Sequence, residues 1–256
     1  MSTSSTVFVY AGRNIRGWSR TPSILVNSLI MPIGMLLTTV FMFGNAIEMA
    51  TGSAPVQGLT PLMICTGPMF AGIASASGLV TERTTGIFTR FRTFPGPVNA
   101  PIIGRIAAET ARGTVGAVLI LAVGFLIGYR LDVDSVAAGV LSVVGIIAVA
   151  ALVSLAFSSM LTWVGLVMRT PEATVAAMPV MMILLFMNEG FMPAEGFPSA
   201  LRSLVELNPL SAAVEAMNAC AGHGGSVWPA LVWLVGVTVV GLTLVTVQTR
   251  RGWSRP

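Results

Sequence analysis

The chain of 256 residues is 54% hydrophobic and 9% charged, and its mean hydropathy is +0.85. This composition leaves too little polar surface to cover a water-soluble domain, so it excludes a soluble globular protein. The formal net charge of +4 is carried by arginine in short clusters between apolar runs, since the sequence contains no lysine. Clusters of this kind typically face lipid headgroups, so we expect no nucleic-acid partner.

The first 21 residues predict an amphipathic helix that lies on the membrane surface. At about 100° per residue, apolar side chains gather on one side of this segment and arginines on the other. The apolar side consists of Val7, Phe8, Ala11, Ile15 and Trp18, and the basic side of Arg13, Arg16 and Arg20. A disordered leader is the alternative. The apolar stretch 24–44 that follows is too long for the core of a cleaved signal peptide, so we interpret it as a retained helix.

Six apolar runs follow along the chain, each suited to cross about 30 Å of hydrocarbon as a helix. They cover residues 22–44, 58–80, 106–128, 136–167, 173–192 and 226–248. The fourth is longer than a bilayer needs, so we expect it to tilt or to extend past the headgroups. The sequence therefore predicts an all-α polytopic membrane protein with six transmembrane helices. It forms a single domain, 1–256, with the membrane part at 22–248 and a tail at 249–256.

The arginines also predict the orientation, because cytoplasmic loops are enriched in basic residues. With both termini inside, only Arg130 and Arg202 fall on the outer side, and Arg112 lies just inside the third helix. The inner side then holds Arg13, Arg16, Arg20, Arg83, Arg90, Arg92, Arg105, Arg169, Arg250, Arg251 and Arg255. This asymmetry predicts a multi-pass membrane protein with both termini cytoplasmic. The absence of lysine and the abundance of Ala, Gly and Val suggest a GC-rich bacterial genome, so we expect the bacterial cell membrane. It also places Cys220 outside and Cys65 within the bilayer.

The inner segment 81–105 is basic, contains three phenylalanines and is interrupted by three prolines. We expect a short cytoplasmic helix over 84–93 that ends before Pro95. Phe88 and Phe91 are three residues apart, so they would project from one side of that helix. This pattern favours docking to a protein; the alternative is a helix that merely rests on lipid.

The fifth run contains a cluster of methionines and a proline, Pro179, which we expect to kink its helix. Methionines adapt to varied ligands but also fill cores, so both a substrate surface and simple packing remain open. The cluster consists of Met178, Met181, Met182 and Met187. The segment 188–225 that follows is punctuated by Gly and Pro, and it predicts short outer helices that cap the membrane or dip partly into it.

Ionisable side chains are nearly absent from the middle of the apolar runs, which disfavours transport coupled to protons or sodium ions. Near the start of the third helix, however, Arg105, Glu109 and Arg112 share one face at positions i, i+4 and i+7. An interfacial stripe of ion pairs and a gating contact are both open interpretations of this group.

Residues for several kinds of catalysis are missing from the sequence. A phosphate-binding P-loop needs a lysine and an H-E-x-x-H zinc site needs two histidines, whereas the chain has no lysine and one histidine, His223. We therefore expect no catalytic residues, no metal site and no cofactor on this chain. An intramembrane serine protease, with a serine of 72–78 and His223 as base, is the alternative from another class. The predicted topology separates these groups by a whole bilayer.

The segment 78–105 resembles the inner loop of the ABC-2 type permeases, especially the daunorubicin-resistance-type drug exporters. Their pattern E-R-x-x-G-[TI]-[LF]-x-R-[LF]-R-x-x-P is matched by Glu82, Arg83, Gly86, Ile87, Phe88, Arg90, Phe91, Arg92 and Pro95. Other segments that look like that family are Gly104-Arg105, Gly128-Tyr129-Arg130, Phe191-Met192-Pro193 and Asn208-Pro209-Leu210. The chain departs from the pattern at Pro97-Val98-Asn99, where the family usually has a basic residue after the proline.

The resemblance implies a half-transporter that pairs with a second permease copy or a related permease chain. Separate ABC ATP-binding subunits would carry ATP and Mg²⁺, and the matched residues would form the surface that couples to them. A hydrophobic small-molecule or lipid substrate would move outward along the dimer interface, chiefly between helices 2 and 5. Candidate residues on this path are Met63, Phe70, Met178, Met182 and Phe186. A polysaccharide or glycolipid exporter is the alternative within transport. Such an exporter needs a sugar-sized channel lined by aromatic side chains, which the 7% aromatic content disfavours.

Overall fold

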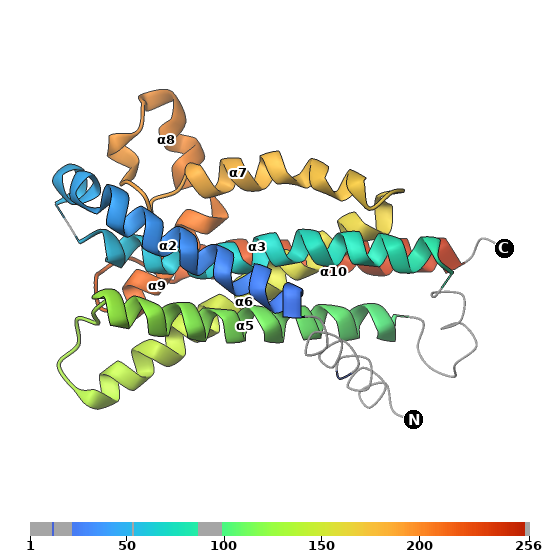
Figure 1. Ribbon diagram of the computed structural model, residues 1–256, viewed down its shortest axis with the longest axis horizontal. Helices are drawn as coiled ribbons and strands as arrows, with labels where there is room; N and C mark the ends of the chain where they lie inside the picture. The colour runs from blue at the N-terminus through green and yellow to red at the C-terminus, as the bar shows by residue number, and fades with distance from the viewer. Residues whose placement is uncertain (1–11, 13–21, 53, 87–98, 254–256) are drawn as a thin grey trace.

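A computed structural model of the protein describes residues 12, 22–52, 54–86 and 99–253. Almost all of the predicted N-terminal amphipathic helix lies outside the described residues, and so do residues 87–93 of the predicted coupling helix 84–93. The described part is helical throughout, as the composition predicts (Figure 1). Its α-helices are α2 (Pro22–Thr51), α3 (Pro55–Thr84), α5 (Ala100–Ile127), α6 (Val136–Val167), α7 (Met178–Phe186), α8 (Ser199–Glu206), α9 (Pro209–Cys220) and α10 (Trp228–Trp253), and its two short 3-10 helices are η1 (Glu172–Ala177) and η2 (Ala194–Gly196).

Among the described residues, five helices are long and apolar enough to cross a membrane, namely α2, α3, α5, α6 and α10. The bounds of α6 are those that the sequence predicts, and its 32 residues span about 48 Å. That length exceeds the hydrocarbon thickness, which agrees with the expectation of a tilted or protruding helix. The last helix, α10, continues to Trp253, so the tail that we expected from residue 249 begins as helix.

The fifth apolar run is not one continuous helix of membrane length. It forms η1 followed directly by α7, which together cover Glu172–Phe186 and rise by about 25 Å. Pro179 lies in the first turn of α7, where its missing N–H leaves no hydrogen bond unmade. The expected kink at Pro179 is therefore wrong, because the proline begins a helix instead of bending one.

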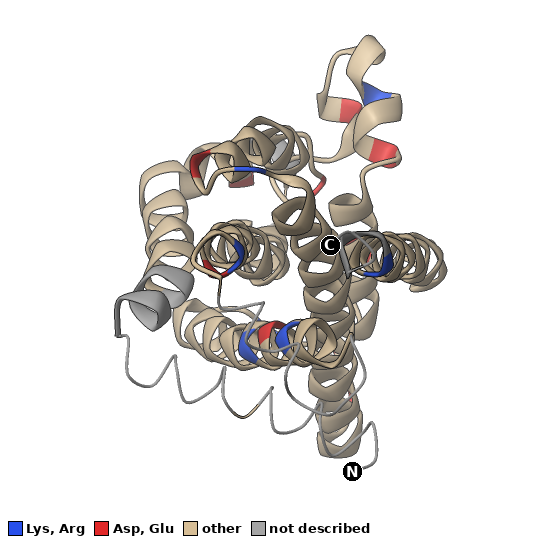
Figure 2. Ribbon diagram, turned by 90° about the vertical axis from the view of Figure 1, so that its right-hand side faces the viewer, with Lys and Arg blue, Asp and Glu red and all other residues tan. Residues whose placement is uncertain are grey.

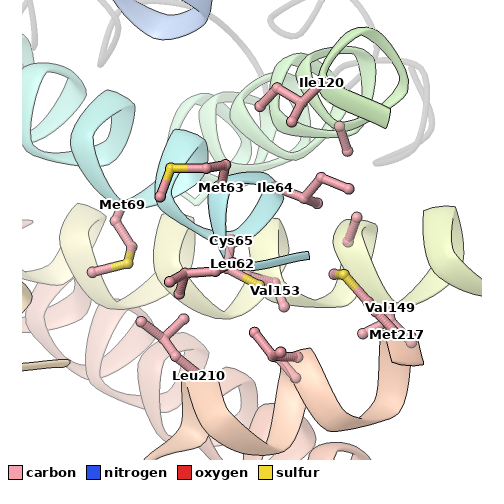
Figure 3. Close-up of a cluster of buried hydrophobic side chains, with 14 of the residues drawn as sticks. Leu62, Met63, Ile64, Cys65, Met69, Ile120, Val149, Val153, Leu210 and Met217 are labelled. Atoms are coloured by element: carbon pink, nitrogen blue, oxygen red, sulfur yellow. The ribbon is translucent and has the colours of Figure 1, made fainter. Parts of the chain in front are cut away.

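Helix α3 lies at the centre of the bundle and contacts α2, α5, α6 and α9. In its most apolar stretch 61% of the residues are buried, compared with 17% in α2. Figure 3 shows side chains of α3 interleaved with those of α5, α6 and α9. The labelled members of this cluster are Leu62, Met63, Ile64, Cys65, Met69, Ile120, Val149, Val153, Leu210 and Met217. Helix α3 corresponds to the second predicted transmembrane helix, which we expected to line the substrate path. Its side chains pack mainly within their own chain.

Glycines allow α3 and α6 to approach closely. A Cβ on Gly165 of α6 would lie 2.8 Å from the carbonyl oxygen of Ala76 on α3, and a Cβ on Gly72 would meet the side chain of Leu161. Small residues at such crossings are the usual way to pack helices in lipid, where no hydrophobic effect drives helices together. The predicted small-residue stretch 72–78 thus serves packing.

The predicted short helices between the fifth and last apolar runs are present as η2, α8 and α9 (Figure 1). Helix α9 contacts α3, α6 and α10, and its residues Leu210, Ala213 and Met217 are fully buried. Helix α8 contacts η2 and α9, and Leu204 of α8 and Leu207 directly after it are exposed. One of these short helices is thus part of the core, whereas the other lies on its edge.

Candidate functional site

The C-terminal end of α3 carries the first two residues of the predicted coupling group. Glu82 forms an ion pair with Arg105 of α5, with 2.7 Å between Oε2 and Nη1. The Nε of Arg105 also donates to Ser75 Oγ at 3.2 Å. These side chains are partly buried, with exposed fractions of 25% for Glu82 and 13% for Arg105. The pair therefore ties α3 to α5 just before the chain enters the segment 87–98.

Arg83 reaches from α3 to the end of α6. Its Nη1 donates to the carbonyl oxygens of Gly165, Leu166 and Met168 at 3.0, 2.6 and 3.2 Å. The last carbonyls of a helix lack intrahelical partners, so the guanidinium caps α6 and its charge complements the helix dipole. Since η1 begins at Glu172, Arg83 binds the chain just before the fifth segment starts.

A second charged pair lies deeper in the bundle. Glu109 and Arg112 of α5 form an ion pair at i, i+3, and Arg112 also donates to the carbonyl oxygen of Ala71 at 3.2 Å. Both side chains are nearly buried, with exposed fractions of 9% and 7%. Arg112 lies about 18 Å along α5 from its first residue, so the pair is well inside the helix bundle. An interfacial stripe does not describe it, since α3 and α6 enclose the pair.

The buried pair borders a small cavity of about 20 Å³ between α3, α5 and α6. The polar groups that line the cavity are Glu109, Arg112, Ser154 and Ser158. Much of the remaining lining comes from glycines and alanines, whose small side chains leave the space open. A cavity of this size is large enough for about one water molecule.

Most of the remaining predicted coupling residues lie outside the part of the chain that the structure describes. Gly86 follows the end of α3 with a positive φ of 73°, a conformation in which glycine is favoured, so the chain can turn there. Those outside the described residues are Ile87, Phe88, Arg90, Phe91, Arg92 and Pro95.

The predicted substrate residues do not share one surface. Met63 is fully buried in the core of its own chain, so its side chain has no surface to offer a substrate. Phe70 of α3 and Met182 of α7 are half-buried. Met178 and Phe186 of α7 are exposed, and the Phe186 ring stacks on Phe191 with 5.9 Å between centroids. The exposed candidates are therefore confined to α7.

The geometry gives no support to the protease alternative. Ser75 contacts Arg105 near the start of α5, whereas the His223 ring packs edge-on against Tyr129 just after the end of α5. Positions 105 and 129 are separated by about 36 Å of helix. A serine nucleophile and its base must lie within hydrogen-bond reach of one another. The described residues also contain no group of three His, Cys, Asp or Glu side chains suited to hold a metal ion.

Two further polar side chains join helices in contacts that the sequence does not reveal. Ser75 links Arg105 to α3, and Asn208 joins the end of α7 to the start of α9. The sequence signals the second as an N-cap before a proline, but it does not reveal the partner helix.

The apolar helix bundle defines the chain as a polytopic α-helical membrane protein. Figure 2 views this bundle from the end where the C-terminus lies, and it shows charged segments on only a few turns of the described helices. The Glu82–Arg105 ion pair and the Arg83 cap lie where α3 ends, α5 begins and α6 ends, so they join three long helices at one end of the bundle.

Comparison with known proteins identifies the family. The model of the ABC-2 type transporter family matches residues 6–220, so the chain belongs to that family. The chain is 24% identical over 242 residues to the probable doxorubicin resistance ABC transporter permease protein DrrC of Mycobacterium tuberculosis, an alignment that covers 93% of this chain and 86% of the relative. It is 28% identical over 227 residues to the daunorubicin resistance ABC transporter permease protein DrrB1 of Streptomyces coeruleorubidus, covering 85% and 77%. Its function is therefore that of the transmembrane permease of an ABC exporter.

Proposed function

We propose that this chain is one half of a drug exporter of the bacterial cell membrane, in which a separate ABC subunit hydrolyses ATP. A second copy of the chain, or a related permease, would complete the pathway. The relatives' names connect those proteins with resistance to doxorubicin and daunorubicin. By similarity, hydrophobic drugs of this kind are the proposed substrates.

The observation that carries the coupling proposal is the set of contacts at the end of α3. Glu82 pairs with α5 and Arg83 caps α6, so a displacement of the segment 87–98 would pull on both helices together. The following residues include Phe88 and Phe91, which we propose as the anchors of the ATP-binding subunit. Aromatic anchors flanked by arginines typically dominate interface energies.

The charge distribution supports the proposed orientation. In the described part of the chain, the coupling end carries Arg83, Arg105, Arg169 and Arg250, whereas the segments at the opposite end are mainly acidic. That opposite end holds Asp132, Asp134, Glu189, Glu195, Glu206 and Glu215. Basic residues concentrate on the cytoplasmic side, so the coupling end would lie inside. The segment formed by η1 and α7 would then complete six passages with both termini cytoplasmic.

Helix α7 is the proposed substrate surface. Its inward side chains, Met181 and Leu185, are buried, whereas Met178, Ile183 and Phe186 face away from the bundle. This face is apolar and adaptable, as a surface for varied hydrophobic molecules should be. In a two-permease assembly it would line the shared pathway.

Export by the reconstituted complex tests the proposal. The permease is co-expressed with the ABC ATP-binding subunits of its source organism, and the subunit that co-purifies is reconstituted with it in liposomes. We expect accumulation of doxorubicin that requires ATP. Phe88→Ala with Phe91→Ala should abolish co-purification of the ATP-binding subunit and leave the permease folded. The matched control, Phe41→Ala with Phe43→Ala, removes two exposed phenylalanines of α2 and should change neither.

Two results would contradict parts of this proposal. Absence of ATP-dependent accumulation with every such ATP-binding subunit would reject the exporter with this substrate. Normal co-purification of the Phe88/Phe91 variant would place the coupling joint elsewhere, and the exposed residues Arg169 and Glu172 would then be the next to replace.

A further inference from the structure

The outer end of α7 is held by a side chain from another helix. Helix α7 ends at Phe186, and its last carbonyl groups lack partners within the helix. The amide nitrogen of Asn208 donates to the carbonyl oxygens of Leu184 at 2.7 Å and of Met187 at 2.5 Å. Asn208 is only 4% exposed, so water does not provide these bonds instead. Unpaired carbonyls in an apolar environment are costly, which makes the asparagine a strong fastening.

The other end of the same amide caps α9. The Asn208 Oδ1 accepts a hydrogen bond from the backbone N–H of Leu210 at 2.9 Å, and Pro209 occupies the first turn of that helix. The buried side chain of Asn208 therefore donates to carbonyl oxygens at the end of α7 and accepts from a backbone N–H at the start of α9. Since α9 is embedded between α3, α6 and α10, the end of α7 is fastened to the rigid core.

The turn after α7 is seated on the same core. Ser211 Oγ accepts from the backbone N–H of Glu189 at 3.2 Å, and Asn188 Oδ1 accepts from that of Gly190 at 2.7 Å. A Cβ on Gly58 of α3 would lie only 2.6 Å from the carbonyl oxygen of Gly190, so the two backbones touch. We call the residues Asn188, Glu189, Gly190, Asn208 and Ser211 the outer clasp.

Packing alone holds α7 weakly. Of its nine residues only Met181 and Leu185 are buried, while Val180, Ile183 and Phe186 are each more than half exposed. The direction in which α7 presents its apolar face therefore depends on how its two ends are held, inside by the Arg83 cap of α6 and outside by Asn208.

We propose that Asn208 is a positioning residue for export: by fastening the outer end of α7 to α9, it fixes the face of α7 that meets the substrate. This inference rests on the proposed function, in which that face lines the pathway. Asn208 touches no substrate in this scheme and acts through α7. Loss of its amide donors should let the α7 end separate from α9, and substrate binding should weaken while the ATP-driven machinery stays assembled.

The test compares Asn208→Ser with wild type in the full permease–ATPase complex. Serine keeps an oxygen that can cap α9, but it has no amide to reach Leu184 and Met187. The matched control is Asn218→Ser in α9, because Asn218 Oδ1 has no hydrogen-bond partner in the described part of the chain. Ser211→Ala, which removes the weaker bond to Glu189, serves if Asn208→Ser does not fold.

Two measurements decide the outcome. Backbone hydrogen exchange over 184–192 should become about tenfold faster in Asn208→Ser and should not change in Asn218→Ser. The doxorubicin concentration that half-stimulates ATP hydrolysis should rise about tenfold, with basal hydrolysis unchanged. A merely structural role would reduce the amount of active complex and leave the half-stimulating concentration where it was.

Unchanged hydrogen exchange over 184–192 in Asn208→Ser would contradict the claim that Asn208 holds the end of α7 against α9. Faster exchange with an unchanged half-stimulating concentration would overturn the positioning role. If the wild-type chain binds no ATP-binding subunit at all, the proposed function fails, and the exchange comparison still confirms or rejects the fastening of α7 to α9.

Discussion

The buried pair of Glu109 and Arg112 allows a quantitative test of the bundle. Replacing Glu109 by leucine leaves the guanidinium of Arg112 without its carboxylate among α3, α5 and α6. Breaking one side of a buried ion pair typically costs about 3–5 kcal/mol, because a charge stays in an apolar environment. Arg112 keeps its bond to the Ala71 carbonyl oxygen, so we expect the lower end of that range, about 3 kcal/mol.

The double replacement separates charge from packing. Glu109→Leu with Arg112→Leu removes both charges, and such exchanges are often neutral or stabilising. We therefore expect the double variant to be more stable than Glu109→Leu alone. For a chain of this size, about 3 kcal/mol corresponds to a fall of roughly 6–12 °C in Tm. The comparison pair, Glu82 and Arg105, is more exposed, so Glu82→Leu should lower Tm by much less.

Thermal unfolding of the purified permease, followed by tryptophan fluorescence, measures these differences. The order of Tm should be wild type close to the double variant, then Glu82→Leu, then Glu109→Leu. High salt should not alter the effect of Glu109→Leu, since a buried pair is weakly screened. If the double variant were as unstable as Glu109→Leu, the loss would come from packing, and the electrostatic reasoning would be refuted.

Two further predictions concern topology and helix packing. A membrane-impermeant maleimide on intact cells should not label Cys65, because this residue is fully buried. It should label Cys220 slowly. Burial raises the pKa of this half-buried thiol, so little thiolate is present at neutral pH. Labelling of Cys220 should quicken as pH rises, and labelling only after permeabilisation would reverse the proposed orientation. Gly165→Ala should lower stability by about 1–3 kcal/mol through its clash with the Ala76 backbone, whereas Gly236→Ala, where a Cβ meets nothing within 4 Å, should be neutral or stabilising. Equal Tm values for these two alanine variants would contradict the close α3–α6 contact.

The sequence predicts the helical class because the membrane allows few alternatives. Backbone N–H and C=O groups in lipid must form hydrogen bonds within the helix. A long apolar run therefore predicts a helix directly. The bounds of α6 agree with its apolar run for this reason. Pro179 was misread, since a proline within a run can begin a helix as well as kink one, and only the 3-10 turn before it decides between the two.

The candidate site was predictable only in part. The spacing of Arg105, Glu109 and Arg112 on one face follows from helical geometry, and the sequence shows it. The pair of Glu109 with Arg112 follows from that spacing, but the partner of Arg105 does not, because Glu82 lies on another helix. A partner twenty or more residues away depends on how two helices dock, and local patterns carry no information on that.

The sequence by itself determined the class of the protein, its apolar spans and its resemblance to the ABC-2 permeases, because hydropathy and short motifs are local properties. Tertiary structure decided that Met63 belongs to the core, that α3 is central, and that Arg83 and Asn208 bind carbonyl groups of helices distant in sequence. For Arg83 and Asn208 the physical reason is the same. A helix leaves its last carbonyls without partners wherever it ends, but which side chain satisfies them depends on the packing of the whole bundle.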